Sequence, residues 1–210
     1  MNIAILGITG GVGTALAEQA LAAGHHVIGI ARRPEAVTLQ HKALEIKRGA
    51  ADDVPTLTAA IAGCEVVVSA VGTGGLRSAS KPTTLYSTAA QSLTVAMTAA
   101  GVKRIVAVSA GSVEPTPNWP LIYRLIIHRI LKNMADDMIR METIIRAAGC
   151  CYLFVRPAGL SDKPHTGIYR TEPNVTPKGG IRIGRADLAD YMLKRIEADD
   201  YQHEAVGLAE

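Results

Sequence analysis

The chain has 210 residues, of which 48% are hydrophobic, 20% are charged and only 4% are aromatic. This length suits one α/β domain that buries its own core without disulfides or metals. The formal net charge of +3 is too small to indicate a nucleic-acid-binding protein, and the three cysteines lack the Cys-x-x-Cys spacing of zinc or redox sites. We therefore expect core thiols and no metal site.

Short aliphatic segments alternate with longer helical segments along most of the chain. The predicted strands cover residues 2–6, 27–30, 44–47, 65–70, 104–108 and 152–155. The predicted helices cover residues 12–23, 54–62, 83–100, 121–148 and 186–198, and residues 205–209 form a possible edge strand. This repeated βα pattern predicts a single α/β domain over residues 1–210, a three-layer αβα structure with a Rossmann-type, doubly wound parallel sheet.

The first predicted strand leads directly into a glycine turn, Gly-x-x-Gly-x-x-Gly, at the start of a helix. Glycines at these positions permit a tight turn, let backbone N–H groups approach a pyrophosphate, and let the helix pack closely on the sheet. The alternative interpretation is a turn without a ligand. The predicted cofactor-binding residues of this segment are Gly7, Thr9, Gly10, Gly11, Val12 and Gly13.

Two arginines, Arg32 and Arg33, follow the second predicted strand. Proteins specific for NAD place an Asp or Glu about 20 residues beyond the glycine turn, where it binds the ribose 2′-hydroxyl. Two cations without an anion suit the 2′-phosphate of NADP(H) instead. We therefore expect NADP(H) as the cofactor, with a solvated surface pair as the alternative interpretation of these arginines.

The glycine spacing and five further segments resemble the biliverdin-IX-beta reductase or flavin reductase family, an atypical group of short-chain dehydrogenase-like proteins. These segments are Val71-Gly-Thr73, Pro82-Thr-Thr84, Ala135–Glu142, Arg156–Tyr169 and Gly184–Leu193. The resemblance implies that Gly72 and Thr73 border the adenosine half of the cofactor. It also implies that Ser109, which is the one catalytic candidate, approaches the nicotinamide ribose or the substrate.

The same resemblance places Pro157, Ala158 and Gly159 along the nicotinamide and gives residues 157–210 the substrate side of the domain. The sequence departs from the family at Ala50-Ala51, where an Asp-Val pair contacts adenine. It departs again at Gly159 and Met138, each of which replaces a histidine. These departures weaken the prediction of bilin reduction more than the prediction of cofactor binding.

Many dehydrogenases of the wider superfamily use a Tyr-x-x-x-Lys pair as proton donor. No such pair occurs here, since Ile127 follows Tyr123 at that spacing and Arg195 follows Tyr191. Hydride transfer to a conjugated acceptor needs mainly stacking and alignment, and water supplies the proton. We therefore expect an NADPH-dependent oxidoreductase that reduces a flavin, bilin or quinone-like small molecule.

We expect this protein to be cytoplasmic and to have no membrane partner, because residues 1–16 lack a basic leader and are interrupted by glycines. We also expect a monomer or homodimer with no nucleic-acid partner. The main alternative is a non-enzymatic NADP(H)-sensing regulator of the nitrogen-metabolite-repressor type. A hydrolase is also considered, since Ser109 nearly matches a nucleophile elbow and His203 follows later. A sugar-nucleotide epimerase is less favoured, because the tail after Arg156 is short.

Overall fold

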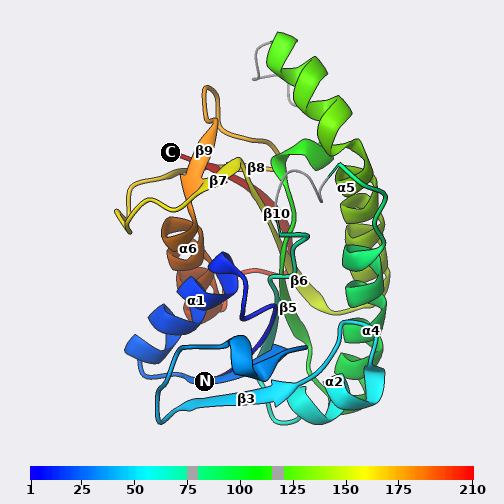
Figure 1. Ribbon diagram of the computed structural model, residues 1–210, viewed down its shortest axis with the longest axis vertical. Helices are drawn as coiled ribbons and strands as arrows, with labels where there is room; N and C mark the ends of the chain where they lie inside the picture. Colours follow the sequence, from blue (N-terminus) through cyan, green and yellow to red (C-terminus); the bar gives the residue numbers. More distant parts are fainter. Residues whose placement is uncertain (75–79, 115–120) are drawn as a thin grey trace.

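The computed structural model describes residues 1–74, 80–114 and 121–210, with the backbone alone for residues 121–128. Strands and helices alternate through most of the chain (Figure 1). The strands are β1 (Asn2–Leu6), β2 (His26–Ala31), β3 (Leu44–Arg48), β4 (Val66–Ser69), β5 (Arg104–Val108), β6 (Cys151–Pro157), β7 (Gly159–Ser161), β8 (Arg170–Pro173), β9 (Arg182–Gly184) and β10 (His203–Ala209). The helices are α1 (Gly11–Ala22), α2 (Val54–Ile61), α4 (Leu85–Ala100), α5 (Leu121–Ala147) and α6 (Arg185–Ala198), with 3-10 turns η1 (Pro34–Ala36) and η2 (Gly111–Val113).

The described strands form one eight-stranded sheet in the order β3-β2-β1-β4-β5-β6-β10-β8. Its neighbours pair in parallel, except that β8 runs antiparallel to β10. The chain winds outward from β1 to β3 and then continues from β4 in the other direction, so that the connections diverge between β1 and β4. Ligands of doubly wound sheets bind beyond the carboxyl ends of the strands at such a point. The predicted Rossmann-type fold is thereby confirmed.

The carboxyl-terminal strand was expected at an edge of the sheet, and this prediction is wrong. Strand β10 lies between β6 and β8, and its last five residues are buried. The edge belongs to β8, which is short, and most of its residues are exposed. A four-residue strand without an apolar pattern leaves no periodic signal in the sequence. Strands β7 and β9 pair with each other in a separate two-stranded sheet and were missed for the same reason.

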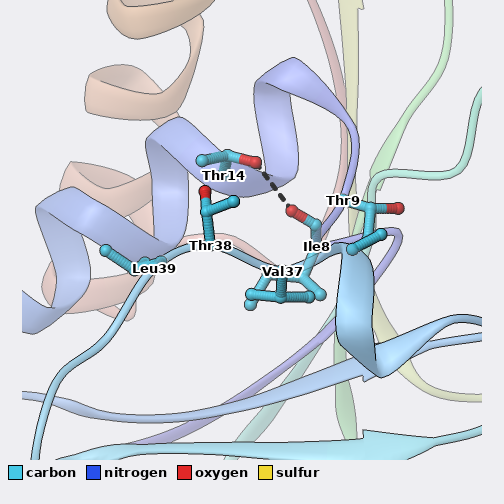
Figure 2. Close-up of a pocket in the computed structure, with 7 residues that line it drawn as sticks. Ile8, Thr9, Thr14, Val37, Thr38 and Leu39 are labelled. Carbon is cyan, nitrogen blue, oxygen red and sulfur yellow. Dashed lines mark hydrogen bonds between the residues drawn. The ribbon is translucent and has the colours of Figure 1, made fainter.

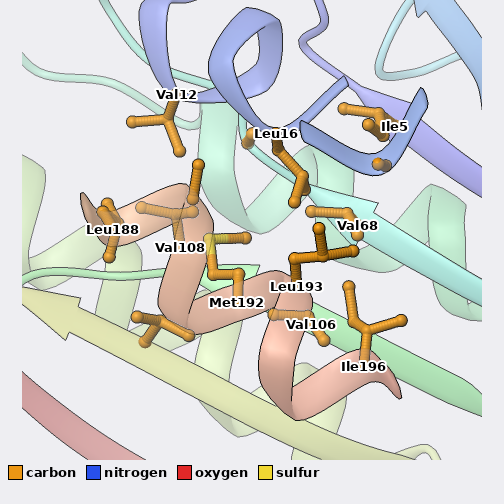
Figure 3. Packing of buried hydrophobic residues seen from close by; sticks show 14 of the residues in the cluster. Ile5, Val12, Leu16, Val68, Val106, Val108, Leu188, Met192, Leu193 and Ile196 are labelled. Atoms are coloured by element: carbon orange, nitrogen blue, oxygen red, sulfur yellow. The ribbon is translucent and has the colours of Figure 1, made fainter. Parts of the chain in front are cut away.

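The helices cover both faces of the large sheet, with α1 and α6 on one face and α2, α4 and α5 on the other (Figure 1). Figure 3 shows the first layer, in which Val12 and Leu16 of α1 meet Leu188 and Met192 of α6 above the sheet valines. This burial of aliphatic side chains is the main stabilising contribution to the layer. Among the described helices, none is long and apolar enough to cross a membrane.

Candidate functional site

The glycine turn after β1 is held by close backbone contacts. Gly7 adopts a φ of 92°, and a Cβ atom at this position would lie 2.6 Å from the carbonyl oxygen of Ala70. A Cβ atom on Gly13 would lie 2.3 Å from the Gly7 oxygen, while the Gly10 N–H donates to that oxygen at 2.9 Å. The turn therefore requires glycine at both of its ends, and it brings the carboxyl ends of β1 and β4 together.

Helix α1 begins at this turn with its amino-terminal end free of side-chain caps. Its N-cap residue is Gly10, whose position supplies no capping side chain, and its first turn carries no acidic residue. Thr9, Gly10 and Gly11 are exposed, so the positive end of the helix dipole faces solvent. The Val12 side chain is buried in the core, which leaves only its backbone for a ligand. This arrangement suits an anion such as a pyrophosphate.

A small cavity of about 130 Å³ adjoins the glycine turn (Figure 2). It lies between the start of α1 and the segment that follows η1, and the Thr14 hydroxyl beside it donates to the Ile8 oxygen at 2.8 Å. Pockets that enclose small-molecule ligands usually measure about 300–1,000 Å³. The cavity is therefore too small to enclose a dinucleotide.

Arg32 and Arg33 directly follow β2, and both side chains are exposed. The Arg48 guanidinium donates to the Arg32 carbonyl oxygen at 3.0 Å and lies 3.5 Å from the Glu35 carboxylate. Arg48 therefore steadies the backbone of the arginine pair and also partly neutralises the nearby acid. The two arginine side chains are therefore open to solvent.

Gly72 and Thr73 follow β4, with Gly72 exposed and Thr73 half-buried. Thr73 is hydrogen-bonded to Tyr86 of α4; burial raises the pKa of Tyr86, and this bond opposes the rise. The first turn of α4 is anchored by the buried Asp137, which accepts hydrogen bonds from the Tyr86 N–H and the Ser87 hydroxyl. The end of β4 is thus connected through α4 to α5.

Ser109, the predicted catalytic residue, lies at the end of β5 and is only 2% exposed. Its hydroxyl donates to Oε1 of Glu142 at 2.8 Å. Glu142 also accepts two hydrogen bonds from Arg156, at 2.9 Å from Nε and 2.6 Å from Nη2. The network joins β5, α5 and β6, and it commits the Ser109 proton to a carboxylate.

Arg156 has two further partners besides Glu142. Its Nη1 donates to the Asn174 oxygen at 2.9 Å, and its Nη2 lies 3.2 Å from the Glu114 carboxylate. Burial opposes the charge of Arg156, but its hydrogen bonds to Glu142 and Glu114 and their negative charges outweigh burial and raise the pKa of the guanidinium. A buried charge of this kind is tolerable only when fully paired, as it is here.

Small side chains predominate directly after β5, in residues 109–113, and at the end of β6, in residues 157–159. Pro157 and Ala158 are buried, whereas Gly159 is exposed. The Gly159 N–H donates to the Ile181 oxygen at 2.9 Å, and a Cβ atom on Gly111 would lie 3.4 Å from the Pro157 oxygen. The structure therefore brings together the two strand ends on which the sequence placed the nicotinamide.

The segment between β7 and β8 is fastened to α6 by two aspartates. The buried Asp187 accepts hydrogen bonds from the Thr166 and Gly167 amides, both at 2.8 Å, and from the Thr166 hydroxyl. Burial alone would raise the pKa of Asp187, but these bonds outweigh it and hold that pKa below its ordinary value. Burial and the neighbouring Asp190 raise the pKa of Tyr169, whose hydroxyl donates to Asp190.

The structure argues against the hydrolase interpretation of Ser109. Strand β10 places His203 beside Tyr152, and β6 places Tyr152 beside Ile105. Ile105 precedes Ser109 by four residues, which corresponds to about 13 Å along a strand. His203 therefore lies near the opposite end of the sheet and cannot activate this serine. Met138, which stands where the family has a histidine, is buried in the core.

Sequence reasoning did not identify Glu142 as the partner of Ser109 and Arg156, or Asp187 as the residue that holds the segment after β7. Each belongs to a segment that carries the family resemblance, Ala135–Glu142 or Gly184–Leu193. A charged residue within an apolar helical face was the available signal for Glu142. Among the described residues, no group of three His, Cys, Asp or Glu side chains could hold a metal ion.

Comparisons with known proteins give a family and relatives for this chain. A family model described as NAD(P)H-binding matches residues 7–199. The uncharacterized sugar epimerase YhfK of Bacillus subtilis strain 168 is 27% identical over 154 residues, which are 73% of this chain and 67% of that protein. The oxidoreductase AgnL4 of Paecilomyces divaricatus is 28% identical over 175 residues, covering 75% and 66%. The chain thus spans about two thirds of the length of these relatives.

Solved structures share the fold over the whole chain. A short-chain dehydrogenase/reductase of Veillonella parvula DSM 2008, in complex with NADP, matches with a TM-score of 0.82 at 16% identity, covering 100% of this chain and 94% of that one. ChuY, an anaerobilin reductase of Escherichia coli O157:H7, gives 0.78 at 21%, covering 100% and 97%. A provisionally assigned NADH-flavin reductase of Streptococcus pneumoniae TIGR4 gives 0.75 at 20%, covering 100% and 99%. These neighbours confirm the expected resemblance at the level of fold.

Proposed function

Because the chain belongs to the NAD(P)H-binding family, we propose that it is an NADPH-dependent reductase of a flavin or a related conjugated small molecule. The observation that carries the proposal is the exposed glycine turn at the uncapped start of α1, close to the arginine pair after β2. A Cβ atom at Gly7 or Gly13 would collide with backbone, so the turn keeps this shape only with glycine at both positions. The residues present fit a dinucleotide.

In this proposal the cofactor extends along the carboxyl ends of the parallel strands. The glycine turn binds the pyrophosphate, and Arg32 with Arg33 binds the 2′-phosphate. Gly72 and Thr73 border the adenosine half, since they follow β4 next to the turn. The strand ends after β5 and β6 receive the nicotinamide half. When bound, NADPH supplies a hydride to the acceptor.

The two segments at the proposed nicotinamide end carry no side chain that could donate a proton as a general acid. Residues 109–113 and 157–161 contain no titratable side chain. Leu160 follows Gly159 in the chain, and the Ile181 oxygen accepts a hydrogen bond from the Gly159 N–H; their side chains, which are 38% and 50% exposed, offer apolar surface to a planar acceptor. Reduction of a conjugated acceptor fits such a site, because alignment and stacking carry the reaction and water supplies the proton.

Ser109 has a defined part in this proposal. Its proton is engaged by Glu142, so toward a ligand its oxygen can act only as a hydrogen-bond acceptor. We assign to it a contact with the nicotinamide ribose or the acceptor. Pro157, Ala158 and Gly159 supply backbone groups beside the same ring.

The proposal is tested by incubating the purified protein with NADPH and FMN, riboflavin, biliverdin or a quinone. Loss of the nicotinamide absorbance in the presence of protein is the expected result with at least one acceptor. Silence across the whole panel contradicts a reductase. Tight NADP(H) binding combined with such silence and a co-purifying protein partner supports the alternative, a cofactor-sensing regulator.

A further inference from the structure

Arg185 crosses the amino-terminal end of α1. It is the first residue of α6, and its stem passes directly over Gly11, the first residue of α1. A Cβ atom on Gly11 would lie 2.6 Å from Cδ and 3.0 Å from Nε of Arg185. Any larger residue at position 11 would displace the guanidinium. The glycine turn and this arginine therefore fit each other as a unit.

The positive charge of Arg185 is poorly matched to the protein groups around it. The start of a helix carries partial positive charge, and no acidic residue or side-chain cap offsets it at α1. The guanidinium pairs with Asp162, whose side chain is 89% exposed. An ion pair with so exposed a partner contributes little and is readily exchanged.

The base of Arg185 is firmly placed. The Gln19 side chain of α1 donates to the Ala186 oxygen at 2.9 Å and joins the two helices at this point. One residue further on, Asp187 holds the Thr166 and Gly167 amides. The arginine stem is thus fixed relative to the glycine turn, while the Asp162 carboxylate lies in the exposed segment after β7.

We propose that Arg185 is a ligand of the dinucleotide pyrophosphate and gives up Asp162 when the cofactor binds. The inference rests on the proposed function, because it assumes that the glycine turn receives a dinucleotide. An arginine can bind a phosphate through two parallel N–H donors, which an ammonium group cannot do. The exchange releases Asp162 close to Gly159, so cofactor binding reaches the segment where the acceptor is proposed to lie.

The test measures the dissociation constants of three probes by titration calorimetry. NADP⁺ contains the pyrophosphate and the 2′-phosphate, ADP-ribose contains only the pyrophosphate, and adenosine 2′-monophosphate contains only the 2′-phosphate. Arg185→Gln should raise the dissociation constants of NADP⁺ and ADP-ribose by about 10- to 100-fold. The dissociation constant of adenosine 2′-monophosphate should stay within about twofold of its native value. Lys194→Gln, which removes an exposed positive charge from the same helix, is the matched control and should change none of them.

Asp162→Asn provides a second arm that does not depend on the integrity of α6. Removing the competing carboxylate should tighten NADP⁺ binding by about two- to fivefold. Weaker NADP⁺ binding by this variant would overturn the exchange of partners. Unchanged binding by Arg185→Gln, or equal losses for all three probes, would overturn the pyrophosphate assignment. If native protein binds none of the probes, the proposed function itself fails.

Discussion

The carboxylate of Glu142 and the guanidinium of Arg156 form a two-point ion pair inside the protein. Both side chains are 1% exposed, and two N–H groups of Arg156 meet the two oxygens of Glu142 at 2.9 and 2.6 Å. Ser109 donates to the same carboxylate, and Arg146 approaches it from the next turn of α5. The pair therefore fixes the strand ends on which the proposed nicotinamide site is built.

Glu142→Gln should lower the free energy of unfolding by about 3–5 kcal/mol, since it removes one partner of a buried pair and leaves the other charge buried. Chemical denaturation provides the measurement. The control is Asp136→Asn, which breaks an exposed pair with Lys132 on the same helix and should cost less than about 1 kcal/mol. Equal losses of unfolding free energy for the two substitutions would show that the buried pair stabilises the protein no more than the exposed pair does.

Ser109→Ala tests the catalytic assignment. If the hydroxyl accepts one hydrogen bond from the ribose or acceptor, kcat/KM should fall by about 5- to 10-fold, the effect of one neutral hydrogen bond. Steady-state kinetics with NADPH and the best acceptor measure it. A fall above about 1,000-fold would instead indicate proton-transfer or nucleophilic chemistry at this serine. Unchanged kinetics would remove Ser109 from the site.

Gly13→Ala should lower the free energy of unfolding by about 1–3 kcal/mol, because the new methyl group meets the Gly7 carbonyl at 2.3 Å. The displaced turn should also bind NADP⁺ more weakly. Gly72→Ala is the steric control, since a Cβ atom there meets nothing within 4 Å, and its stability should stay within about 0.5 kcal/mol of the native protein. A fully stable Gly13→Ala protein would contradict the close packing of the turn.

The combined substitution of Arg32 and Arg33 by alanine tests the origin of cofactor preference. It should weaken NADP⁺ binding by about 10- to 100-fold and leave NAD⁺ binding nearly unchanged, because only NADP⁺ carries the 2′-phosphate. Titration calorimetry with both nucleotides measures the difference. Lys42→Ala removes another exposed positive charge, two residues before β3, and serves as the control. An equal loss for both nucleotides would reject the 2′-phosphate assignment.

Acid should release the segment after β7 through Asp187. The folded protein holds the pKa of this carboxyl below its ordinary value, so Asp187 contributes stability above about pH 4, and the contribution disappears as pH falls through the folded pKa. Asp187→Asn should therefore be less stable at pH 7, and the difference should shrink in acid. Thermal denaturation across pH measures this. Asp52→Asn, which alters an exposed carboxyl, is the control and should leave the free energy of unfolding at pH 7 within about 0.5 kcal/mol of the native protein.

Local sequence signals predicted the regular part of the fold correctly. Strands β1 and β5 match their predicted bounds, because continuous aliphatic runs are buried on both faces of a parallel sheet. Gly101 illustrates the helix ends: it follows α4 with a φ of 74° and accommodates the left-handed conformation expected of a helix-terminating glycine. Such signals act over a few residues and survive in the folded protein.

The remaining features depend on contacts between distant residues and could not be read from local patterns. Strand β8 exists through its pairing with β10, and the Glu142 network joins residues from three separate elements. Similarly, the relation of Arg185 to Gly11 spans 174 positions along the chain and becomes visible only once α6 packs on α1. Glu142 and Arg185 lie in segments that resemble the family, but only the fold brings them together with their partners.

The central claim is that the glycine turn and the arginine pair form a site for NADP(H). Titration calorimetry of the native protein with NADPH and with NADH tests it most directly. We expect one site per chain, with NADPH bound at least about tenfold more tightly than NADH, because one charged phosphate contact is worth at least that factor. The absence of binding by either nucleotide, or a preference for NADH, would contradict the account.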